Sequence, residues 1–301
     1  MKKMLLITAA MMVFLPSCCC LVKEKPVKKD IGIQLYSIRH KIGSPELYAQ
    51  NHIEVFKGLA DLGYTAVEAA SYADGKLYGV APEQFKSDVE AAGLIALSSH
   101  VVKELSQEEM ASGDFSASLQ WWKQCVEAHK KAGMKYIVMP WLSFPATLKD
   151  LQLNCEYFNA VGKLCKERGI LFGYHNHAHE FNKVEDKELM YDYLLSNTDP
   201  ELVFFQMDVY WTVKANYPPV DYFKKYPGRF KLLHIKDVME LGQSGMVGFD
   251  AIFNNAETAG LEYPIVELEG CSADDWKKSV GACSKYLIEA PFVKSSYAGA
   301  R

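Results

Sequence analysis

The sequence predicts a (β/α)8 barrel. Three observations predict it. Short β-type runs alternate with longer helical runs eight times from Ile31 onward. Predicted helices repeatedly stop at a glycine that a strand follows within a few residues. Eight such units occupy about 250 residues, which is the usual size of this barrel. An open doubly wound sheet is the alternative, but no Gly-x-Gly-x-x-Gly turn follows the first strand.

The eight predicted strands are short runs rich in β-branched and aromatic residues. In chain order they are Ile31–Ser37, Thr65–Ala70, Ile95–Val101, Lys135–Met139, Ile170–His175, Leu202–Asp208, Phe230–Lys236 and Tyr263–Leu268. Eight predicted helices follow them one by one: Glu46–Leu62, Pro82–Ala92, Phe115–Ala132, Leu148–Arg168, Lys187–Ser196, Pro219–Tyr226, Phe249–Ala259 and Ala273–Ile288. The glycines that end helices are Gly63, Gly93, Gly133, Gly169 and Gly260. Strict alternation requires parallel pairing with right-handed crossovers.

Composition excludes several classes of protein. The 301 residues carry a formal charge of −4, and no basic run follows the first thirty residues, so nucleic acid is not an expected partner. Three of the eight cysteines form the cluster Cys18–Cys20, and no Cys-x-x-Cys pair exists, which excludes a zinc ribbon. A chain of this size buries enough apolar surface to fold without disulfides or a structural metal.

The N-terminus has the pattern of an export signal. Lys2 and Lys3 precede the short apolar stretch Met4–Leu15. Leu15-Pro16-Ser17-Cys18 resembles the cleavage box of bacterial lipoproteins, in which the cysteine is acylated. We therefore expect a signal peptide over 1–17, a lipidated Cys18 with a flexible tether over 18–30, the barrel over 31–290 and a tail over 291–301. An ordinary secretory signal is the alternative. Export and anchoring to a bacterial membrane through the lipid alone are the expected localisation.

Ionisable residues gather where predicted strands end, which is where this barrel carries its active site. Asp208, His234 and Glu267 end strands six, seven and eight, so they can converge near the barrel axis. Two carboxylates and one imidazole suit Mn²⁺, Zn²⁺, Co²⁺ or Fe²⁺. Taken singly, each also has a purely structural interpretation as a cap, a buried histidine or an ion-pair partner.

The fifth strand ends in a run of histidines. Alternation places His175 and His177 on the same side of the strand. We expect His175 to be a fourth metal ligand, and His177 to orient a substrate oxygen or bind metal. Glu180 is either a base or an ion-pair partner. Further strand-end residues are expected to contact substrate: Tyr36, Glu68, His100, Trp211 and Lys236.

Five motifs in order resemble the sugar phosphate isomerase/epimerase superfamily, the xylose isomerase-like barrels that include inosose dehydratases, keto-sugar epimerases and hydroxypyruvate isomerases. The motifs are Gln34–Ser37, Gly173–His177, Met207–Trp211, His234–Asp237 and Val266–Glu267. The resemblance extends from Ile31 to about Glu289. It implies a Mn²⁺-type metal, with Mg²⁺ also possible, held by strands five to eight. Asp208, His234 and Glu267 match the ligand positions.

The fifth strand departs from that pattern. Many relatives have Glu-Asn-His there, and the glutamate both binds metal and moves a proton. This chain has His175-Asn176-His177, so catalysis by two carboxylates is in doubt while metal binding survives. A base on that face would have to be His177 or Glu180. Glu267 becomes the expected general base on the opposite face.

The expected function is metal-dependent isomerisation or epimerisation of a sugar or keto-sugar by proton transfer next to a carbonyl. Elimination from a keto-sugar or 3-keto-glycoside by a lyase or dehydratase is the first alternative. A metal-dependent hydrolase or nuclease and a non-catalytic, surface carbohydrate-binding lipoprotein are two others. Export and the absence of a phosphate-binding loop make a phosphorylated substrate less expected.

Overall fold

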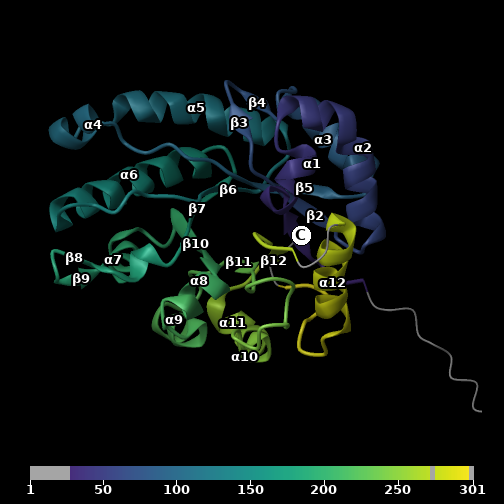
Figure 1. Ribbon diagram of the computed structural model, residues 1–301. Coiled ribbons are helices and arrows are strands. Elements are labelled where there is room, and N and C mark those ends of the chain that lie inside the picture. The colour runs from purple at the N-terminus through teal and green to yellow at the C-terminus, as the bar shows by residue number, and fades with distance from the viewer. Residues whose placement is uncertain (1–27, 272–274, 298–301) are drawn as a thin grey trace, which may run out of the picture.

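The computed structural model describes residues 28–271 and 275–297 and contains a closed barrel of eight parallel strands (Figure 1). The order around the barrel follows the chain: β1 (Gly32–Gln34), β2 (Ala66–Ala69), β5 (Ile95–His100), β6 (Tyr136–Met139), β7 (Leu171–His175), β10 (Val203–Asp208), β11 (Leu232–Ile235) and β12 (Tyr263–Val266). Pairing of β12 with β1 closes the ring. The predicted (β/α)8 barrel is confirmed.

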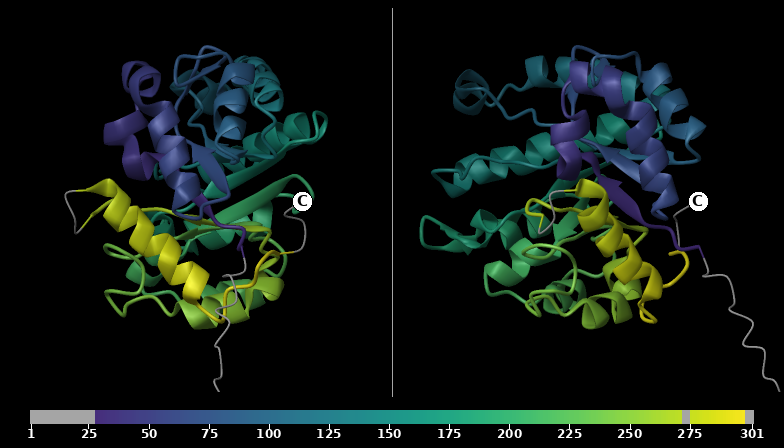
Figure 2. Two further views of the ribbon diagram at one scale, coloured as in Figure 1. Left: turned by 90° about the vertical axis from the view of Figure 1, so that its right-hand side faces the viewer. Right: turned by 45° about the vertical axis from the view of Figure 1, so that its right-hand side comes forward.

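Helices surround the strands on all sides (Figure 2). The outer helices are α2 (Pro45–Asp61), α3 (Pro82–Ala91), α5 (Ser116–Lys131), α6 (Leu148–Lys166), α7 (Met190–Asn197), α9 (Pro219–Lys225), α10 (Phe249–Asn254) with α11 (Ala256–Ala259), and α12 (Trp276–Glu289). The main apolar core fills the space between strands and helices, and a smaller core fills the barrel interior. All five predicted helix-ending glycines have positive φ, between 73° and 91°, as expected for a residue just past a helix.

The interior of the barrel is packed too tightly for a side chain at Gly173. A Cβ atom there would lie 2.5 Å from the ring of Phe204 on the neighbouring strand. Phe204 belongs to the interior core together with Tyr136 and Tyr263. This filled layer closes the barrel below the residues that end the strands, so any site must lie above it.

Several boundaries differ from the prediction. The first strand ends at Gln34 because the Gln34 side chain accepts a hydrogen bond from Tyr36 N and starts a 3-10 helix, η1 (Leu35–Ile38), followed by α1 (Arg39–Ile42). The predicted helix Phe249–Ala259 is interrupted at Asn255. Short elements that the sequence did not predict lie in the loops after the strands: β3 (Tyr72–Ala73) with β4 (Lys76–Leu77), α4 (Gln107–Ser112), η2 (His179–Phe181), β8 (Lys183–Val184) with β9 (Glu188–Leu189), and α8 (Val209–Lys214).

Both predicted flanking segments are partly integrated into the fold. The Lys29 ammonium donates to the carbonyls of Leu287 and Ala290 at the end of α12, where such a cation is favoured. Asp30 N donates to Ser295 O. Residues 28–30 therefore belong to the barrel rather than to a tether, and residues 291–297 pack against it through the buried Val293 rather than forming a loose tail. The predicted signal peptide and Cys18 lie outside the described residues. Across the described ranges, no helix is both long and apolar enough to cross a lipid bilayer.

Candidate active site and metal cluster

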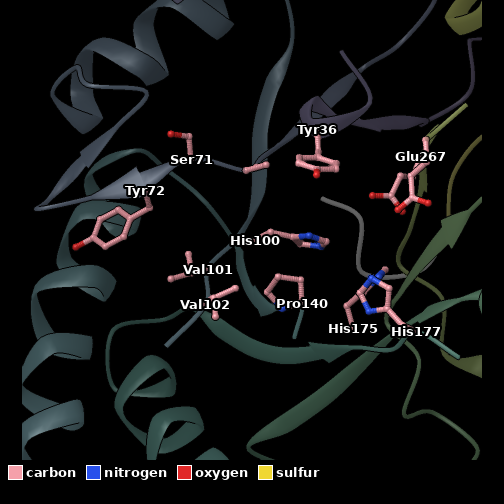
Figure 3. Close-up of a pocket in the computed structure, with 12 residues that line it drawn as sticks. Tyr36, Ser71, Tyr72, His100, Val101, Val102, Pro140, His175, His177 and Glu267 are labelled. Atoms are coloured by element: carbon pink, nitrogen blue, oxygen red, sulfur yellow. The ribbon is translucent and has the colours of Figure 1, made fainter. Parts of the chain in front are cut away.

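A pocket of about 540 Å³ opens at the carboxyl ends of the strands (Figure 3). It is lined by loops after β1, β2, β5, β6, β7 and β12. The lining residues are Tyr36, Ala70, Ser71, Tyr72, His100, Val101, Val102, Pro140, His175, His177, Glu267 and Glu269. Four predicted substrate-contact or catalytic residues lie in this wall: Tyr36, His100, His177 and Glu267.

Four side chains meet at one end of the pocket and form what we call the metal cluster. They come from four neighbouring strand ends: His175 on β7, Asp208 on β10, His234 on β11 and Glu267 just after β12. Each offers one ligand atom, and these atoms all lie within 4.8 Å of one another. All four residues are buried. The four residues predicted as metal ligands are therefore brought together.

The cluster contains polar atoms that nothing else in the described chain satisfies. Nδ1 of His175 and Oδ2 of Asp208 are buried and lack a hydrogen-bond partner among the described residues. Such atoms are rare in folded proteins because each costs free energy. A divalent cation would satisfy both, and its charge would balance the two carboxylates. The donor set therefore fits a metal ion such as Mn²⁺ or Zn²⁺.

His234 lies between two carboxylates. Its Nε2 is 2.6 Å from Oε1 of Glu68, and its Nδ1 is 3.2 Å from Oε2 of Glu267. Burial alone would lower its pKa, but the charges of Glu267 and Glu68 outweigh burial and raise the pKa to about 10. Nδ1 points toward the other cluster residues, so it is the atom that would bind metal. Nε2–H would keep its bond to Glu68, an arrangement that fixes the tautomer of a ligating histidine.

Glu68 is fully buried beneath the pocket and does not line it, which corrects its predicted contact with substrate. Its carboxylate accepts hydrogen bonds from Ser98 Oγ at 2.7 Å and from the amides of Gln34 and Gln206, both at 2.8 Å. Burial would raise its pKa, but His100 and His234 hold the pKa well below its usual range. The physical reason for the correction is that all of its acceptor capacity is used inside the protein.

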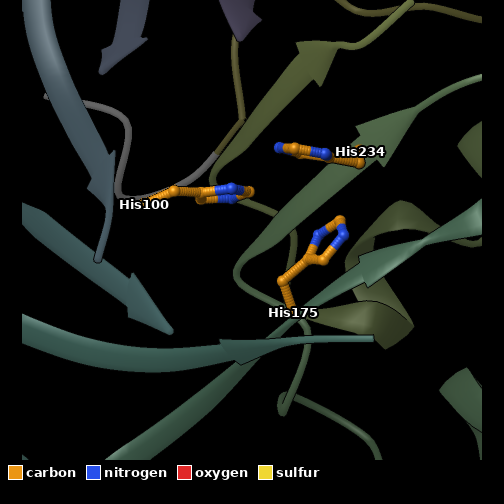
Figure 4. Close-up of side chains that lie close together, drawn as sticks. All are labelled: His100, His175 and His234. Carbon is orange, nitrogen blue, oxygen red and sulfur yellow. The ribbon is translucent and has the colours of Figure 1, made fainter. Parts of the chain in front are cut away.

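Three histidine rings, those of His100, His175 and His234, stand close together (Figure 4). The rings of His100 and His234 stack with centroids 5.0 Å apart. The His175 ring meets the His234 ring edge-on, with centroids 4.6 Å apart. His100 Nε2 lies 2.7 Å from Gln206 Oε1 and 3.1 Å from Glu68 Oε1. Both are acceptors, since the Gln206 amide nitrogen donates to Glu68, so Nε2 carries a proton.

Asp208 is positioned by the backbone around it. Its Oδ1 accepts from Trp211 N at 2.9 Å, and its own N–H donates to Oδ1 of Asn176 at 3.2 Å. Asn176 thereby ties the end of β7 to the end of β10. Burial raises the pKa of Asp208 to about 7, although the charge of Lys236 opposes the rise. A carboxylate with this pKa exchanges a proton for a cation near neutrality.

Lys236 is buried and turned toward carboxylates rather than the pocket. Its ammonium lies 3.3 Å from Oε2 of Glu267 and 3.0 Å from Oε2 of Glu269, and 4.7 Å from the ring centre of Trp211. Lys236 is buried and supports Glu267 rather than facing the pocket, which corrects its predicted contact with substrate. Trp211 is half-buried, with its ring centre 5.8 Å from that of the pocket residue His177, so its contact with substrate stays a prediction. Burial would raise the pKa of Glu267, but His234 and Lys236 outweigh it and lower the pKa.

The two candidate bases in the loop after β7 lie in different surroundings, because Glu180 is buried within the protein and His177 lines the pocket. Glu180 is fully buried, accepts from Tyr174 Oη at 2.6 Å and from His177 N at 2.8 Å, and does not line the pocket. Of its two predicted roles, the structure favours the ion-pair partner, since its Oε2 lies 3.5 Å from Nδ1 of His179, and Glu180 holds the loop. His177 lines the pocket, and burial lowers its pKa to about 4, so its ring is neutral at pH 7.

The sequence interpretation missed the polar residues beneath the cluster: Gln34, Ser98 and Gln206. A signal for them existed, because each is a polar residue within an otherwise apolar, buried strand. It also missed the uncharged wall that Val101, Val102 and Pro140 contribute, since these residues carry no reactive group.

Comparison with known proteins places the chain among sugar-modifying barrels. Two solved structures of sugar phosphate isomerases/epimerases from Parabacteroides distasonis ATCC 8503 are similar to it. One is 37% identical, covers 88% of this chain and 100% of that chain, and has a TM-score of 0.78. The other is 34% identical, covers 93% and 100%, and has a TM-score of 0.79.

An inosose dehydratase of Geobacillus kaustophilus (strain HTA426) is 24% identical over 212 residues. The match covers 65% of this chain and 64% of the dehydratase, so the chain spans less than two thirds of that relative's length. Residues 56–287 match the family described as the xylose isomerase-like TIM barrel. The resemblance drawn from the five sequence motifs is confirmed, and the chain belongs to the xylose isomerase-like TIM barrel family.

Proposed function

We propose that the chain is a metal-dependent enzyme that moves a proton next to the carbonyl group of a sugar or keto-sugar, as an isomerase or epimerase does. The observation that carries this proposal is the metal cluster, with its unsatisfied His175 Nδ1 and Asp208 Oδ2 at one end of an open pocket. The similarity to sugar phosphate isomerases/epimerases supports it.

His175, Asp208, His234 and Glu267 would hold the ion. A divalent cation in such a site polarises adjacent carbonyl and hydroxyl oxygens and makes the neighbouring C–H acidic. Glu68 would keep His234 in the tautomer whose Nδ1 faces the cluster, through the 2.6 Å contact at Nε2. His100 lines the pocket wall, and because its Nε2 is engaged by Gln206, Nδ1 is the ring atom left to hydrogen-bond a sugar hydroxyl.

Two residues are placed to move protons. Glu267 lines the pocket and is ionised near neutrality, and its contacts to His234 and Lys236 both use Oε2, so Oε1 is the oxygen that would accept a proton. His177 reaches the pocket from β7, with β10 and β11 between it and β12. Its buried Nδ1 has no partner in the described chain, which leaves Nε2 to face the substrate. Glu267 would remove the proton and return it to the neighbouring carbon, which relocates the carbonyl group as an isomerase does; inversion of the stereocentre would additionally require a protonated His177 on the other face.

Dehydration is the second candidate function. Histidine at position 175 replaces the carboxylate that a two-carboxylate epimerase would use on that face, and the chain is similar to an inosose dehydratase. In that reaction Glu267 would remove the proton next to the carbonyl, and a hydroxyl group or another β-substituent would leave from the neighbouring carbon. A keto-sugar or 3-keto-glycoside would supply that arrangement.

Proton exchange in heavy water tests the proposal. The purified chain, loaded with Mn²⁺ or Zn²⁺, should incorporate deuterium next to the carbonyl of at least one keto-sugar in a panel followed by NMR. A chelator should abolish the incorporation, and addition of the metal should restore it. Isomers indicate isomerase or epimerase activity, whereas an enone absorbance indicates dehydration. Exchange that continues unchanged in metal-free protein would contradict the proposal.

We also propose that the chain is exported and anchored through a lipid on Cys18, on the strength of the Leu15–Cys18 box. Cys18→Ser should yield an unprocessed precursor or a protein free of membranes, while Cys19→Ser should not. Radiolabelled palmitate and membrane sedimentation report the difference. Continued labelling and sedimentation of the Cys18→Ser protein would refute the anchor.

A further inference from the structure

The loop after β7 holds a second group of potential metal ligands. His177, His179 and Glu180 each offer one ligand atom, and these atoms all lie within 4.8 Å of one another. The group shares no residue with the metal cluster, whose ligands come from four different strand ends. Two imidazoles and one carboxylate are a donor set that proteins use for Zn²⁺.

The hydrogen bond of His179 leaves its other ring nitrogen facing Glu180. Nε2 lies 3.0 Å from the carbonyl oxygen of Leu142, which can only accept, so Nε2 carries a proton. Nδ1 lies 3.5 Å from Oε2 of Glu180. In the neutral ring Nδ1 presents a lone pair, so two lone pairs would face each other. Either a second proton on the ring, which gives the ion pair described above, or a bound cation makes this contact favourable.

The Glu180 carboxylate has no permanent positive charge beside it. It is fully buried, and its ion-pair partner among the described residues is His179 rather than a lysine or arginine. Oε1 accepts from Tyr174 Oη at 2.6 Å and Oε2 from His177 N at 2.8 Å, so each oxygen keeps a further lone pair. Burial raises the pKa of Glu180, although His179 and these hydrogen bonds oppose the rise. A divalent cation at Oε2 would supply the missing charge.

His177 supplies the third donor. Its Nδ1 is buried and has no hydrogen-bond partner in the described chain. The ring of Trp141 packs against both histidines, with its centroid 5.4 Å from that of His177 and 4.7 Å from that of His179. Trp211 lies 5.8 Å from His177 by the same measure. The two tryptophans hold the imidazoles beside Glu180 and give the group an apolar surrounding, which strengthens the binding of a cation.

The distances suit a zinc ion after small side-chain movements. Three atoms no more than 4.8 Å apart leave a point within about 2.8 Å of all of them, and shifts of less than about 1 Å reach the zinc-bond length of about 2.0–2.2 Å. His177 and His179 are only half-buried, so their rings have room to move. A water molecule would complete a coordination of four.

We propose that His177, His179 and Glu180 bind a second divalent cation, of the Zn²⁺ type, independently of the metal cluster. The site does not depend on the proposed function, since it shares no ligand with the metal cluster and involves no substrate. The cation would bind Nδ1 of His177 and leave the ring proton on Nε2, the nitrogen left to face the substrate. It would also replace the proton of His179 in the contact with Glu180.

Counting bound Zn²⁺ tests the site on the full chain. After dialysis against dilute Zn²⁺, elemental analysis should find two ions in the unchanged chain and one in His179→Ala. Glu180→Gln, which keeps the volume of the side chain, should lose the same ion. Asp208→Asn, which disables the metal cluster, should also retain one ion, and Asp208→Asn combined with His179→Ala should retain none. Titration with Mn²⁺, which binds imidazole less tightly than Zn²⁺ does, should show an intact metal cluster in both loop variants.

His52 on the outer helix α2 provides a matched control. Its side chain is 21% exposed, against 23% for His179, and one of its ring nitrogens likewise contacts a backbone carbonyl oxygen, that of Tyr48 at 2.8 Å. His52→Ala should keep both ions.

Two outcomes would overturn the inference: a Zn²⁺ content in His179→Ala equal to that of the unchanged chain, or the same loss in His52→Ala. Either result would mean that this loop holds no specific ion. If the loop variants lose one ion while no keto-sugar exchanges protons, the proposed function fails and the second site stands. If exchange depends on metal while His179→Ala loses no ion, the reverse holds.

Discussion

Strand β12 carries a buried glutamate at each end, and the barrel uses the two differently. Glu262 precedes the strand at the floor of the barrel, and Glu267 follows it at the mouth. Glu262 accepts from Lys135 Nζ and Lys231 Nζ, both at 2.8 Å, and from the hydroxyl of Tyr136. Both of its oxygens are satisfied by the protein.

Glu267 lies instead beside groups that the protein leaves unsatisfied. Oδ2 of Asp208 and Nδ1 of His175 lack partners within the described chain, although both are buried. A carboxylate that is fully paired contributes to folding, whereas unpaired polar atoms oppose folding and persist where a ligand completes them. The comparison teaches that burial of charge alone does not identify a functional site. At the mouth, unpaired atoms of two neighbouring potential ligands lie together, whereas the carboxylate at the floor is fully paired.

Asp208→Asn is expected to have the largest effect, because it tests directly whether the groups at the mouth require a cation. The amide keeps its volume and the bond from Trp211 N but loses the charge that a cation requires. Metal affinity should fall by more than about a hundredfold, beyond the tenfold to hundredfold typical of outer-shell changes, and proton exchange should be lost. Metal analysis after dialysis and calorimetry measure the effect. Asp192→Asn, at a carboxylate of the outer helix α7, is the control. An Asp208→Asn protein that retains full metal occupancy would show that metal binding does not depend on the Asp208 carboxylate, and the contrast between the two ends of β12 would fail.

The second largest expected effect is the pH dependence of metal affinity, which the protons on Asp208 and His234 determine. With pKa values of about 7 for Asp208 and about 10 for His234, the metal-free protein carries both protons at pH 6 and only that of His234 at pH 8.5. Metal binding should release about two protons at pH 6 and about one at pH 8.5, so affinity should fall about hundredfold per pH unit below 7 and about tenfold per unit above it. Calorimetry in buffers of different ionisation enthalpy counts the protons. Equal release at both pH values would contradict the assignment.

In the metal-free protein, Asp208 and His234 make the free energy of unfolding fall as pH rises, whereas metal affinity rises with pH. The unfolded chain loses the Asp208 proton near pH 3.8 and the folded chain near pH 7, so this residue lowers the free energy of unfolding as pH rises from about 4 to 7. His234 stabilises the fold below its unfolded pKa, and that contribution is lost as pH rises through about 10. Glu262, whose pKa its partners lower despite burial, stabilises the fold above its unfolded pKa and loses this contribution as pH falls.

Glu68→Gln tests whether the residues beneath the mouth serve the metal. The amide cannot accept from His234, Ser98, Gln34 and Gln206 together, so the ring of His234 loses its fixed tautomer. Metal affinity should fall tenfold to hundredfold. Ser98→Ala is the control, since it removes one donor to Glu68 and leaves the contact with His234. Equal losses in the two variants would indicate a general packing effect.

Glu262→Gln is expected to have the smallest effect and to affect a different property. It should lower the free energy of unfolding by about 1–2 kcal/mol, because Lys135 and Lys231 lose an ion-pair partner but stay partly exposed. Metal affinity should not change. Denaturant unfolding and calorimetry on the same samples measure the two properties. A loss of metal affinity here would mean that floor and mouth are coupled.

Much of this arrangement could be predicted from the sequence. The helix-ending glycines and the regular alternation predicted every barrel strand, and the convergence of parallel strand ends predicted the metal cluster from His175, Asp208, His234 and Glu267. The convergence of these four side chains was predictable because the chain order of the strands is also their order around the barrel.

The roles of Glu68, Glu180 and Lys236 could not be predicted. Each ends a strand or follows one, as the ligands do, but its side chain turns to a partner inside the protein. The partners of Glu68 and Lys236 lie on other strands or loops, and those of Glu180 lie on β7 and in its own loop. Glu68 meets His234 across 166 residues of sequence. The choice between facing the pocket and facing a buried partner depends on the register and tilt with which the barrel closes, and spacing along the chain does not encode either directly.

The contact between Lys29 and the end of α12 fixes where the chain enters the barrel. Lys29 and Asp30 bond to residues at the floor, the end opposite the pocket. A lipid on Cys18 would therefore hold the enzyme by its base, within about 40 Å of the bilayer given the reach of twelve residues. The mouth would face the surrounding fluid, and substrates would arrive by diffusion from that side rather than along the membrane surface.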